Sequence, residues 1–143
     1  MLSTEDRLAI QAVYARYCAC FDLGDGQGWV NCFAEDGVFK SAKDFRGHAQ
    51  LREFVEGRIK ARADAPNRNV QHWNANLIVE GDGTRAKGMC YILLVGQSVA
   101  NNQIAPAVQG TYSDELVKSG GQWRFASRQM FRDLPPPSVI PQP

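Results

Sequence analysis

The spacing of apolar residues changes once along this chain, at Asp64-Ala-Pro-Asn67. Before that break, apolar residues recur every three or four positions, as on one face of a helix. After it they recur at every second position, as in half-buried strands. Helices first and long strands afterwards predict an α+β fold with one antiparallel sheet. The length of 143 residues, 44% of them hydrophobic, fits one domain.

The first helix is expected to begin after Ser3, a good N-cap residue, and to end at Leu23-Gly24, because glycine commonly follows a helix end. Asp22 then lies in the last turn, where the negative end of the helix dipole disfavours a carboxylate, so a compensating partner is expected. A second helix over residues 27–33, a short strand over 38–40 and a third helix after Gly47 complete the first half. The apolar stripe of the first helix consists of Ile10, Val13, Tyr14, Tyr17 and Phe21.

Four strands are expected over residues 70–79, 85–95, 108–117 and 122–131. Side chains two apart share a face of a strand. In the first strand, one face carries Val70, His72, Asn74, Asn76 and Ile78, and the other carries Gln71, Trp73, Ala75, Leu77 and Val79. The histidine face is polar in its middle and suits a lined pocket. The face with Trp73, Leu77 and Val79 is too apolar for solvent and predicts a second covering layer, such as another subunit.

The overall composition argues against several classes of partner. With 16 basic and 15 acidic residues there is no basic excess, so neither a nucleic-acid nor a membrane partner is expected. No apolar run is long enough to span a membrane, and the N-terminus lacks the layout of a signal peptide. The four cysteines, Cys18, Cys20, Cys32 and Cys90, suggest no disulfide framework, which favours the reduced cytoplasm. The domain is expected to cover residues 1–134, followed by an extended or mobile proline-rich tail at 135–143.

Several short motifs carry a resemblance to a known family. They are Tyr17…Asp22, Phe33-Ala-Glu-Asp-Gly-Val38, His72…Asn76-Leu77, Gly110-Thr-Tyr112 and Trp123-Arg-Phe125…Arg128. With these motifs the chain resembles the SnoaL-like branch of the nuclear transport factor 2-like superfamily over nearly its whole length. The resemblance implies a cystatin-like cone, in which a curved, largely antiparallel mixed sheet wraps around three N-terminal helices. It also implies a pocket open at one end and a homo-oligomer, a dimer or trimer, packed through the outer sheet face.

The resemblance also implies roles for individual residues. The spacing from Asp22 to His72 is similar to that of the Asp/His dyad in scytalone dehydratase, bile acid 7α-dehydratase and hexachlorocyclohexane dehydrochlorinase. Tyr17 matches a tyrosine of the bile acid enzyme and completes the expected catalytic set. The residues expected to bind substrate are Asn74, Arg128, Tyr14 and Phe39. Each role has a structural alternative, such as a satisfied histidine on a strand, a tyrosine packed in the core or an arginine in an ion pair.

The chemistry follows from the dyad. A neutral imidazole, with an ordinary pKa of about 6.5, can take a proton from an activated C–H bond. Asp22 would fix the tautomer and stabilise the imidazolium, and Tyr17 could donate to the substrate oxygen. With no P-loop, dinucleotide motif or metal cluster in the sequence, neither a cofactor nor a metal is expected.

These residues predict a small lyase acting on a mid-sized cyclic or aromatic small molecule. Two alternatives stay open: an isomerase of the ketosteroid isomerase type, and a binding or assembly module such as the β subunit of a ring-hydroxylating dioxygenase.

Overall fold

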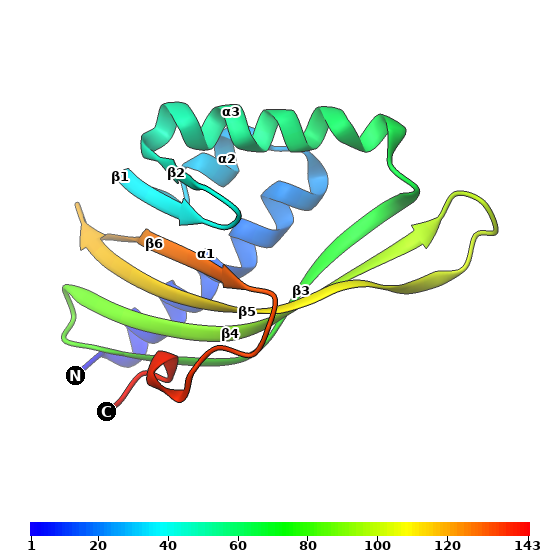
Figure 1. The fold of residues 1–143 in the computed structure, drawn as a ribbon. Helices are drawn as coiled ribbons and strands as arrows, with labels where there is room; N and C mark the ends of the chain where they lie inside the picture. Colours follow the sequence, from blue (N-terminus) through cyan, green and yellow to red (C-terminus); the bar gives the residue numbers. More distant parts are fainter.

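The computed structural model describes all 143 residues. Its elements are α1 (Thr4–Leu23), α2 (Gly26–Val30), β1 (Phe33–Lys40), β2 (Asp44–Arg46), α3 (Gly47–Lys60), the 3-10 turn η1 (Ala61–Asp64), β3 (Asn67–Gly81), β4 (Arg85–Ser98), β5 (Ile104–Ser119), β6 (Gln122–Phe131) and the 3-10 turn η2 (Pro137–Val139). Helices precede the long strands (Figure 1), so the predicted α+β class is confirmed.

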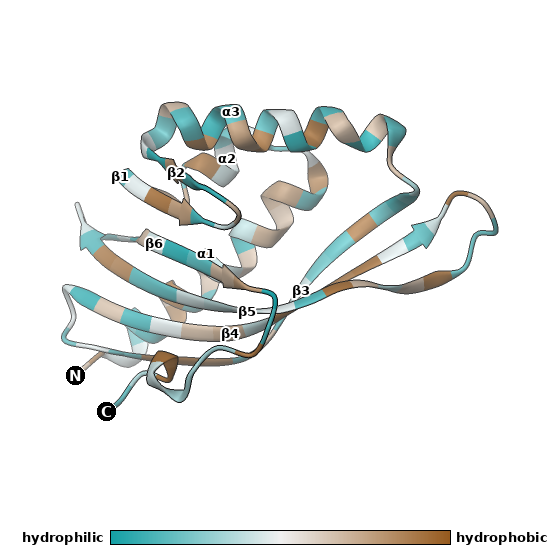
Figure 2. Cartoon of the chain, in the orientation of Figure 1, coloured by the Kyte–Doolittle hydropathy of each residue, from teal (hydrophilic) through white to brown (hydrophobic).

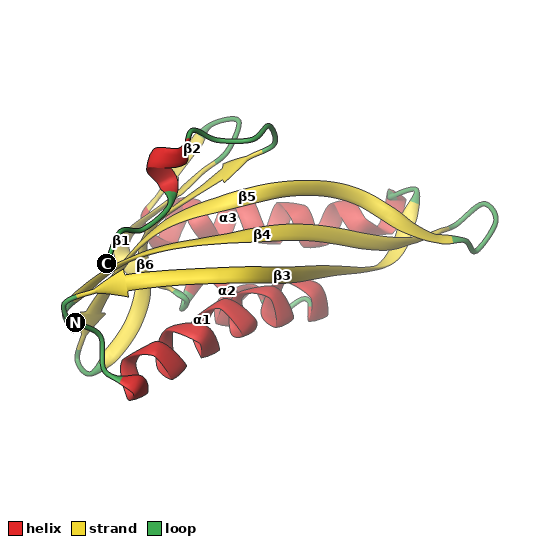
Figure 3. Ribbon diagram, turned by 90° about the horizontal axis from the view of Figure 1, so that it is seen from below, coloured by secondary structure: helices red, strands yellow, loops and turns green.

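The six strands form one mixed sheet in the order β2-β1-β6-β5-β4-β3. Only the β1–β6 pair is parallel, and the other neighbours are antiparallel. The long strands curve, and α1 and α3 lie on the concave side of the sheet (Figure 1). Seen from below, β3, β4 and β5 run side by side with α3 behind them (Figure 3). The sheet therefore wraps around the helices as the family resemblance implies.

The core lies between the helices and the concave face. Hydrophobic and hydrophilic residues alternate along β4 and β5 (Figure 2), so one side of each strand faces this core. The largest fully buried hydrophobic side chains include Trp29, Phe33 and Phe125, whose rings contact one another or Tyr17 at edge or tilted angles. Such aromatic contacts fill the space where α1 and α2 meet the sheet.

Helix α1 begins and ends as its sequence predicts. Ser3 accepts a hydrogen bond from the Asp6 backbone N–H, 3.0 Å away, and Gly24 closes the helix in the left-handed conformation at φ 81°. Ile10, Tyr14 and Tyr17 face the core. Asp22 consequently occupies the last turn, close to β3.

Two boundaries in the first half differ from the prediction. Helix α2 is shorter, and β1 is longer because it begins at Phe33. Strand β2 was not expected at all: it has only three residues, two of them charged, and its pairing with β1 is what makes it a strand. Such a segment has no periodicity of its own.

The face assignment predicted for β3 is wrong beyond Ala75. The pairing with β4 shifts between Ala75 and Ile78, and Asn76 there has a φ of 55°. One extra residue in a strand reverses the faces of the residues that follow it. Leu77 and Val79 therefore face the core, while Ile78 points outward.

The proline-rich tail returns to the body of the domain. Its end lies near the N-terminus in both views (Figures 1 and 3), and Pro141 is buried. The tail also contains the turn η2, so it is not extended throughout. All four cysteines are free and buried. None of the helices has both the length and the apolar character needed to cross a membrane.

Candidate active site

A cavity of about 880 Å³ opens between the end of α1, the helix α3, the turn η1 and the concave sheet. Its interior is aromatic: Tyr17, Phe39 and Tyr112 are buried and line it. His72 lines the same cavity from β3. A cavity of this size and lining is typical of a site for a small organic molecule.

Asp22 and His72 meet at the wall of this cavity. The Asp22 Oδ1 atom lies 2.5 Å from His72 Nδ1, a short hydrogen bond. Asp22 Oδ2 accepts a second hydrogen bond, 2.8 Å long, from the backbone N–H of His72. The two side chains are only 14% and 11% exposed. A neutral His72 bound in this way carries its proton on Nδ1 and keeps the Nε2 lone pair free.

Arg62 supports the dyad from behind, although no sequence motif pointed to it. Its guanidinium donates to the backbone carbonyls of Phe21 and Asp22, the latter at 3.0 Å, and lies over the Phe21 ring at 5.0 Å. The Phe21 ring in turn contacts the His72 ring, with centroids 4.9 Å apart. Helix α1 has no basic residue in its last turn. Arg62 supplies the positive charge there, and together with the His72 N–H it provides the compensation that Asp22 requires.

Tyr17 and Phe39 lie in the cavity wall. Burial raises the pKa of Tyr17 to about 12, so its hydroxyl keeps its proton at neutral pH and can donate a hydrogen bond. Tyr17 and Asp22 project from α1 in different directions, yet both belong to the site because Asp22 acts through His72.

Three residues expected to bind substrate do not line the cavity, and this expectation is corrected. Asn74 donates to the Tyr14 carbonyl oxygen at 3.3 Å and to Cys18 Sγ at 3.1 Å, which ties β3 to α1. The Tyr14 hydroxyl donates to Asp114 at 2.6 Å. Arg128 is fully buried and donates to both oxygens of Asp114, each at 2.8 Å. Internal partners thus hold all three side chains away from the cavity.

The buried Arg128 nevertheless influences the cavity wall. Its guanidinium carbon lies 4.0 to 4.7 Å from the ring centroids of four aromatic residues, Tyr14, Tyr17, Tyr112 and Phe125. Two of these rings, those of Tyr17 and Tyr112, line the cavity. The ion pair with Asp114 therefore fixes the layer directly beneath the aromatic wall.

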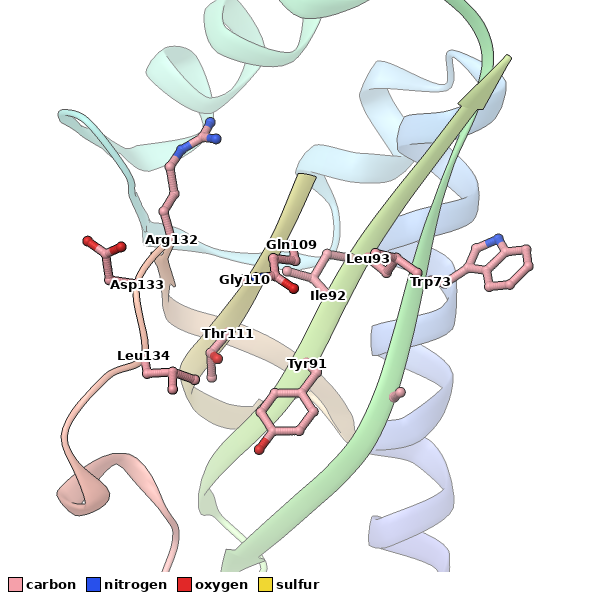
Figure 4. Close-up of a pocket in the computed structure, with 11 residues that line it drawn as sticks. Trp73, Tyr91, Ile92, Leu93, Gln109, Gly110, Thr111, Arg132, Asp133 and Leu134 are labelled. Carbon is pink, nitrogen blue, oxygen red and sulfur yellow. The ribbon is translucent and has the colours of Figure 1, made fainter. Parts of the chain in front are cut away.

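A second hollow, of about 510 Å³, lies on the opposite face of the sheet. Figure 4 shows Tyr91, Thr111 and Leu134 gathered there, beside the chain that leaves β6. Asp133 and Arg132 are its only charged lining residues, and no histidine lines it, so the dyad cavity is the better candidate active site. Among the described residues, no group of three or more His, Cys, Asp or Glu side chains could hold a metal ion.

A curved mixed sheet that wraps around three helices is the cystatin-like fold of nuclear transport factor 2-like proteins. A protein of unknown function with a cystatin-like fold from Nostoc punctiforme shares this architecture at 25% identity, with a TM-score of 0.79 over 96% of this chain and 98% of that one. The family model for the SnoaL-like domain matches residues 3–129. The chain belongs to the SnoaL-like domain family, and the resemblance seen in the sequence is confirmed.

Other solved structures agree on the fold. A protein of unknown function from Mycobacterium tuberculosis, Rv3472, is 35% identical, with a TM-score of 0.80 over 92% of this chain and 78% of that one. A candidate scytalone dehydratase from Novosphingobium aromaticivorans is 21% identical, with a TM-score of 0.75 over 90% of this chain and 84% of that one, and at this identity shows the fold alone. No curated protein matches the chain.

Proposed function

We propose that this protein is a small lyase that removes water or another leaving group from a mid-sized cyclic or aromatic molecule. The observation that carries the proposal is the Asp22–His72 dyad at the wall of an aromatic cavity of about 880 Å³. Histidine is the commonest general base in enzymes, and a dyad partner makes it a better one.

In the proposed reaction, His72 Nε2 takes a proton from a carbon of the substrate. The electron pair of that C–H bond forms a double bond to the neighbouring carbon, and the bond from that carbon to the leaving hydroxyl breaks. The imidazolium returns its proton to the departing oxygen, so the sum of the steps is the loss of one water. Asp22 stabilises the imidazolium between these steps because its carboxylate holds the Nδ1–H.

Tyr17 supplies the hydrogen bond that the substrate oxygen needs. Its pKa of about 12 keeps the hydroxyl protonated, so it donates to an oxygen that gains negative charge as the proton leaves carbon. Phe39 and Tyr112 hold the ring of the substrate by apolar contact.

The same base could instead move a proton without losing a group, which would make the protein an isomerase. Product mass separates the two reactions. Loss of about 18 mass units marks dehydration, whereas an unchanged mass with deuterium taken up from heavy water marks proton transfer alone.

The test is a turnover assay of the purified protein on hydroxylated cyclic ketones and related ring compounds, read by mass spectrometry. The chain has two histidines, and His48 lies outside the cavity with Nε2 3.0 Å from the Phe33 carbonyl oxygen. His72→Ala should remove most turnover, and His48→Ala serves as the matched control and should retain it. Equal activity of both variants and the wild type would refute the proposal.

A further inference from the structure

The charged side chains that line the cavity are all of one sign. Four of the lining residues are basic, namely Lys43, Arg58, Arg62 and Arg132, and none is Asp or Glu. Over the whole chain the basic and acidic residues are nearly balanced, at 16 and 15. The nearest acid is Asp22, which does not line the cavity but binds His72 directly behind its wall. Even with Asp22 counted, four cations against one acid depart strongly from the near balance of the whole chain.

None of these four cations is neutralised by an ion pair within 4.0 Å. Arg62 donates only to backbone carbonyls, which carry no net charge. The Lys43 ammonium lies over the Phe45 ring, 4.9 Å from its centroid, an arrangement that leaves its charge intact. With four unpaired cations and only the Asp22 carboxylate opposing them, the charges around the cavity favour an anion, and its low-dielectric aromatic wall reinforces this preference.

The cations and the aromatic residues occupy different depths. Lys43, Arg58 and Arg132 are exposed and so lie toward the mouth, whereas Tyr17 and Tyr112 are buried. The cations also come from separate parts of the chain: the β1–β2 connection, the last turn of α3, η1 and the end of β6. Arg132 lines both the cavity and the hollow on the outer face. Figure 4 shows its side chain extending away from Tyr91 and Leu134, which line the outer hollow alone.

We infer that the ligand of this cavity is an organic anion, with a cyclic or aromatic body in the aromatic interior and one oxyanion group held by the cations at the mouth. A carboxylate is the simplest such group, and a phosphate ester would present the same chemistry to arginine. The inference rests on the proposed function in that it names the substrate class of the same site. An anchored anion would also fix which carbon of the ring lies next to His72.

The experiment measures binding by calorimetry and needs no turnover. Three ligands share one ring system: 2-naphthoate, 2-naphthyl phosphate and the neutral 2-naphthamide. We expect at least one anion to bind on the order of tenfold more tightly than the amide. We also expect this preference to shrink at roughly 0.5 M salt, because screening weakens exposed charges. Naphthoate and naphthyl phosphate then distinguish a carboxylate site from a phosphate site.

The variant Arg58→Gln with Arg132→Gln removes two mouth cations and should abolish most of the preference without changing the affinity for the amide. The control is Arg85→Gln with Lys87→Gln, which removes two exposed cations of β4 that do not line the cavity. Equal binding of anions and amide, an equal loss in both variants, or no saturable binding of any anion would overturn the inference. None of these results depends on catalysis, so the inference and the proposed lyase activity can fail separately.

Discussion

At the scale of single residues, Asp22 uses both carboxylate oxygens on one partner. Oδ1 takes the imidazole Nδ1–H of His72 and Oδ2 takes the backbone N–H of the same residue. The second bond fixes the carboxylate relative to β3, so the first can orient the ring. Because of this arrangement, the two side chains should act together in catalysis, and kinetic measurements on variants can test this.

If Asp22 and His72 act together, the effects of substituting each of them on kcat/KM should not be additive. Asp22→Asn keeps the shape but brings an amide NH₂ against one of two N–H donors, so it favours the wrong tautomer and removes the charge that stabilises the imidazolium. We expect Asp22→Asn and His72→Ala each to lower kcat/KM on the order of 10² to 10⁴-fold. The double variant should be scarcely worse than the more damaged single one. Steady-state kinetics on the four proteins measure this, and effects that multiply would show that the residues act independently.

Arg128 illustrates a residue whose effect is on stability. The guanidinium and the Asp114 carboxylate are both fully buried, so Arg128→Met would leave an unpaired buried charge. Breaking such a pair costs about 3 to 5 kcal/mol of unfolding free energy. The double variant Arg128→Met with Asp114→Leu should be more stable than that single variant, because no lone charge remains.

Urea denaturation measures these stabilities, and Arg124→Met on the same strand, where the arginine has no ion-pair partner, is the control. A loss below about 1 kcal/mol for Arg128→Met would contradict the assignment of a structural ion pair.

At the scale of elements, Asp6 ties the start of α1 to the sheet where β5 turns into β6. Its Oδ1 accepts from Lys118 Nζ at 2.8 Å and from Trp123 Nε1 at 2.7 Å, which joins α1 to β5 and β6. These two partners, with Lys118 the larger influence, lower the pKa of Asp6 from its ordinary 3.8 to about 2. These hydrogen bonds to the Asp6 carboxylate exist only in the folded protein, so only the folded state has the lowered pKa.

The sign of the pH effect follows. A carboxyl whose pKa is lower in the folded state stabilises the fold above its ordinary pKa, and this contribution disappears as the pH falls through the folded value. We expect wild-type stability to drop between pH 3.8 and about 2 in part through Asp6. In Asp6→Asn this part of the drop should be missing. Thermal melts across that range provide the measurement, with Asp36→Asn at an exposed acid as the control. Parallel curves for the wild type and Asp6→Asn would contradict the prediction.

The helices and strands also show why sequence patterns predicted only part of the candidate site. The caps of α1 and the period-two strands are local, so they predicted the helix and the sheet. The meeting of Asp22 with His72 joins residues 50 positions apart, and only the family resemblance implied it. A bulge is not visible in alternation, because the φ of 55° at Asn76 arises from the pairing with β4 and reverses the faces beyond it. Arg62 reaches the end of α1 from 40 residues away, and no spacing rule connects such partners.

The same limit applies to the residues expected to bind substrate. A tyrosine such as Tyr14 or an arginine such as Arg128 can line a pocket or lie in the core. The sequence does not show which of these two places the side chain takes. Both side chains lie in the core because each donates a hydrogen bond to the buried carboxylate of Asp114. Phe39, by contrast, belongs to the core and also lines the cavity, so its burial does not exclude it from the site.

At the scale of the whole molecule, the two faces of the curved sheet have different partners. The concave face covers the core and the cavity. The convex face carries exposed apolar side chains, among them Trp73, Ile78 and Tyr91, and the hollow of about 510 Å³ beside Leu134. Leu77 and Val79, expected on this face, belong to the core instead. The exposed apolar surface is therefore centred on Trp73 and Tyr91, where β3 and β4 pair.

Exposed aromatic residues grouped on a sheet are typical of a surface that another protein covers, because their burial removes apolar area from water. We propose that a second copy of this chain covers it, giving a homo-oligomer through the outer sheet face. Light scattering at micromolar concentration should report a mass above that of the 15.8 kDa chain. Trp73→Asp should lower it to the monomer, since a carboxylate buried in such an interface would be unpaired. The control is Leu8→Asp on α1, where the leucine is 61% exposed against 55% for Trp73. A monomeric wild type, or an equal response of the two variants, would rule out this interface.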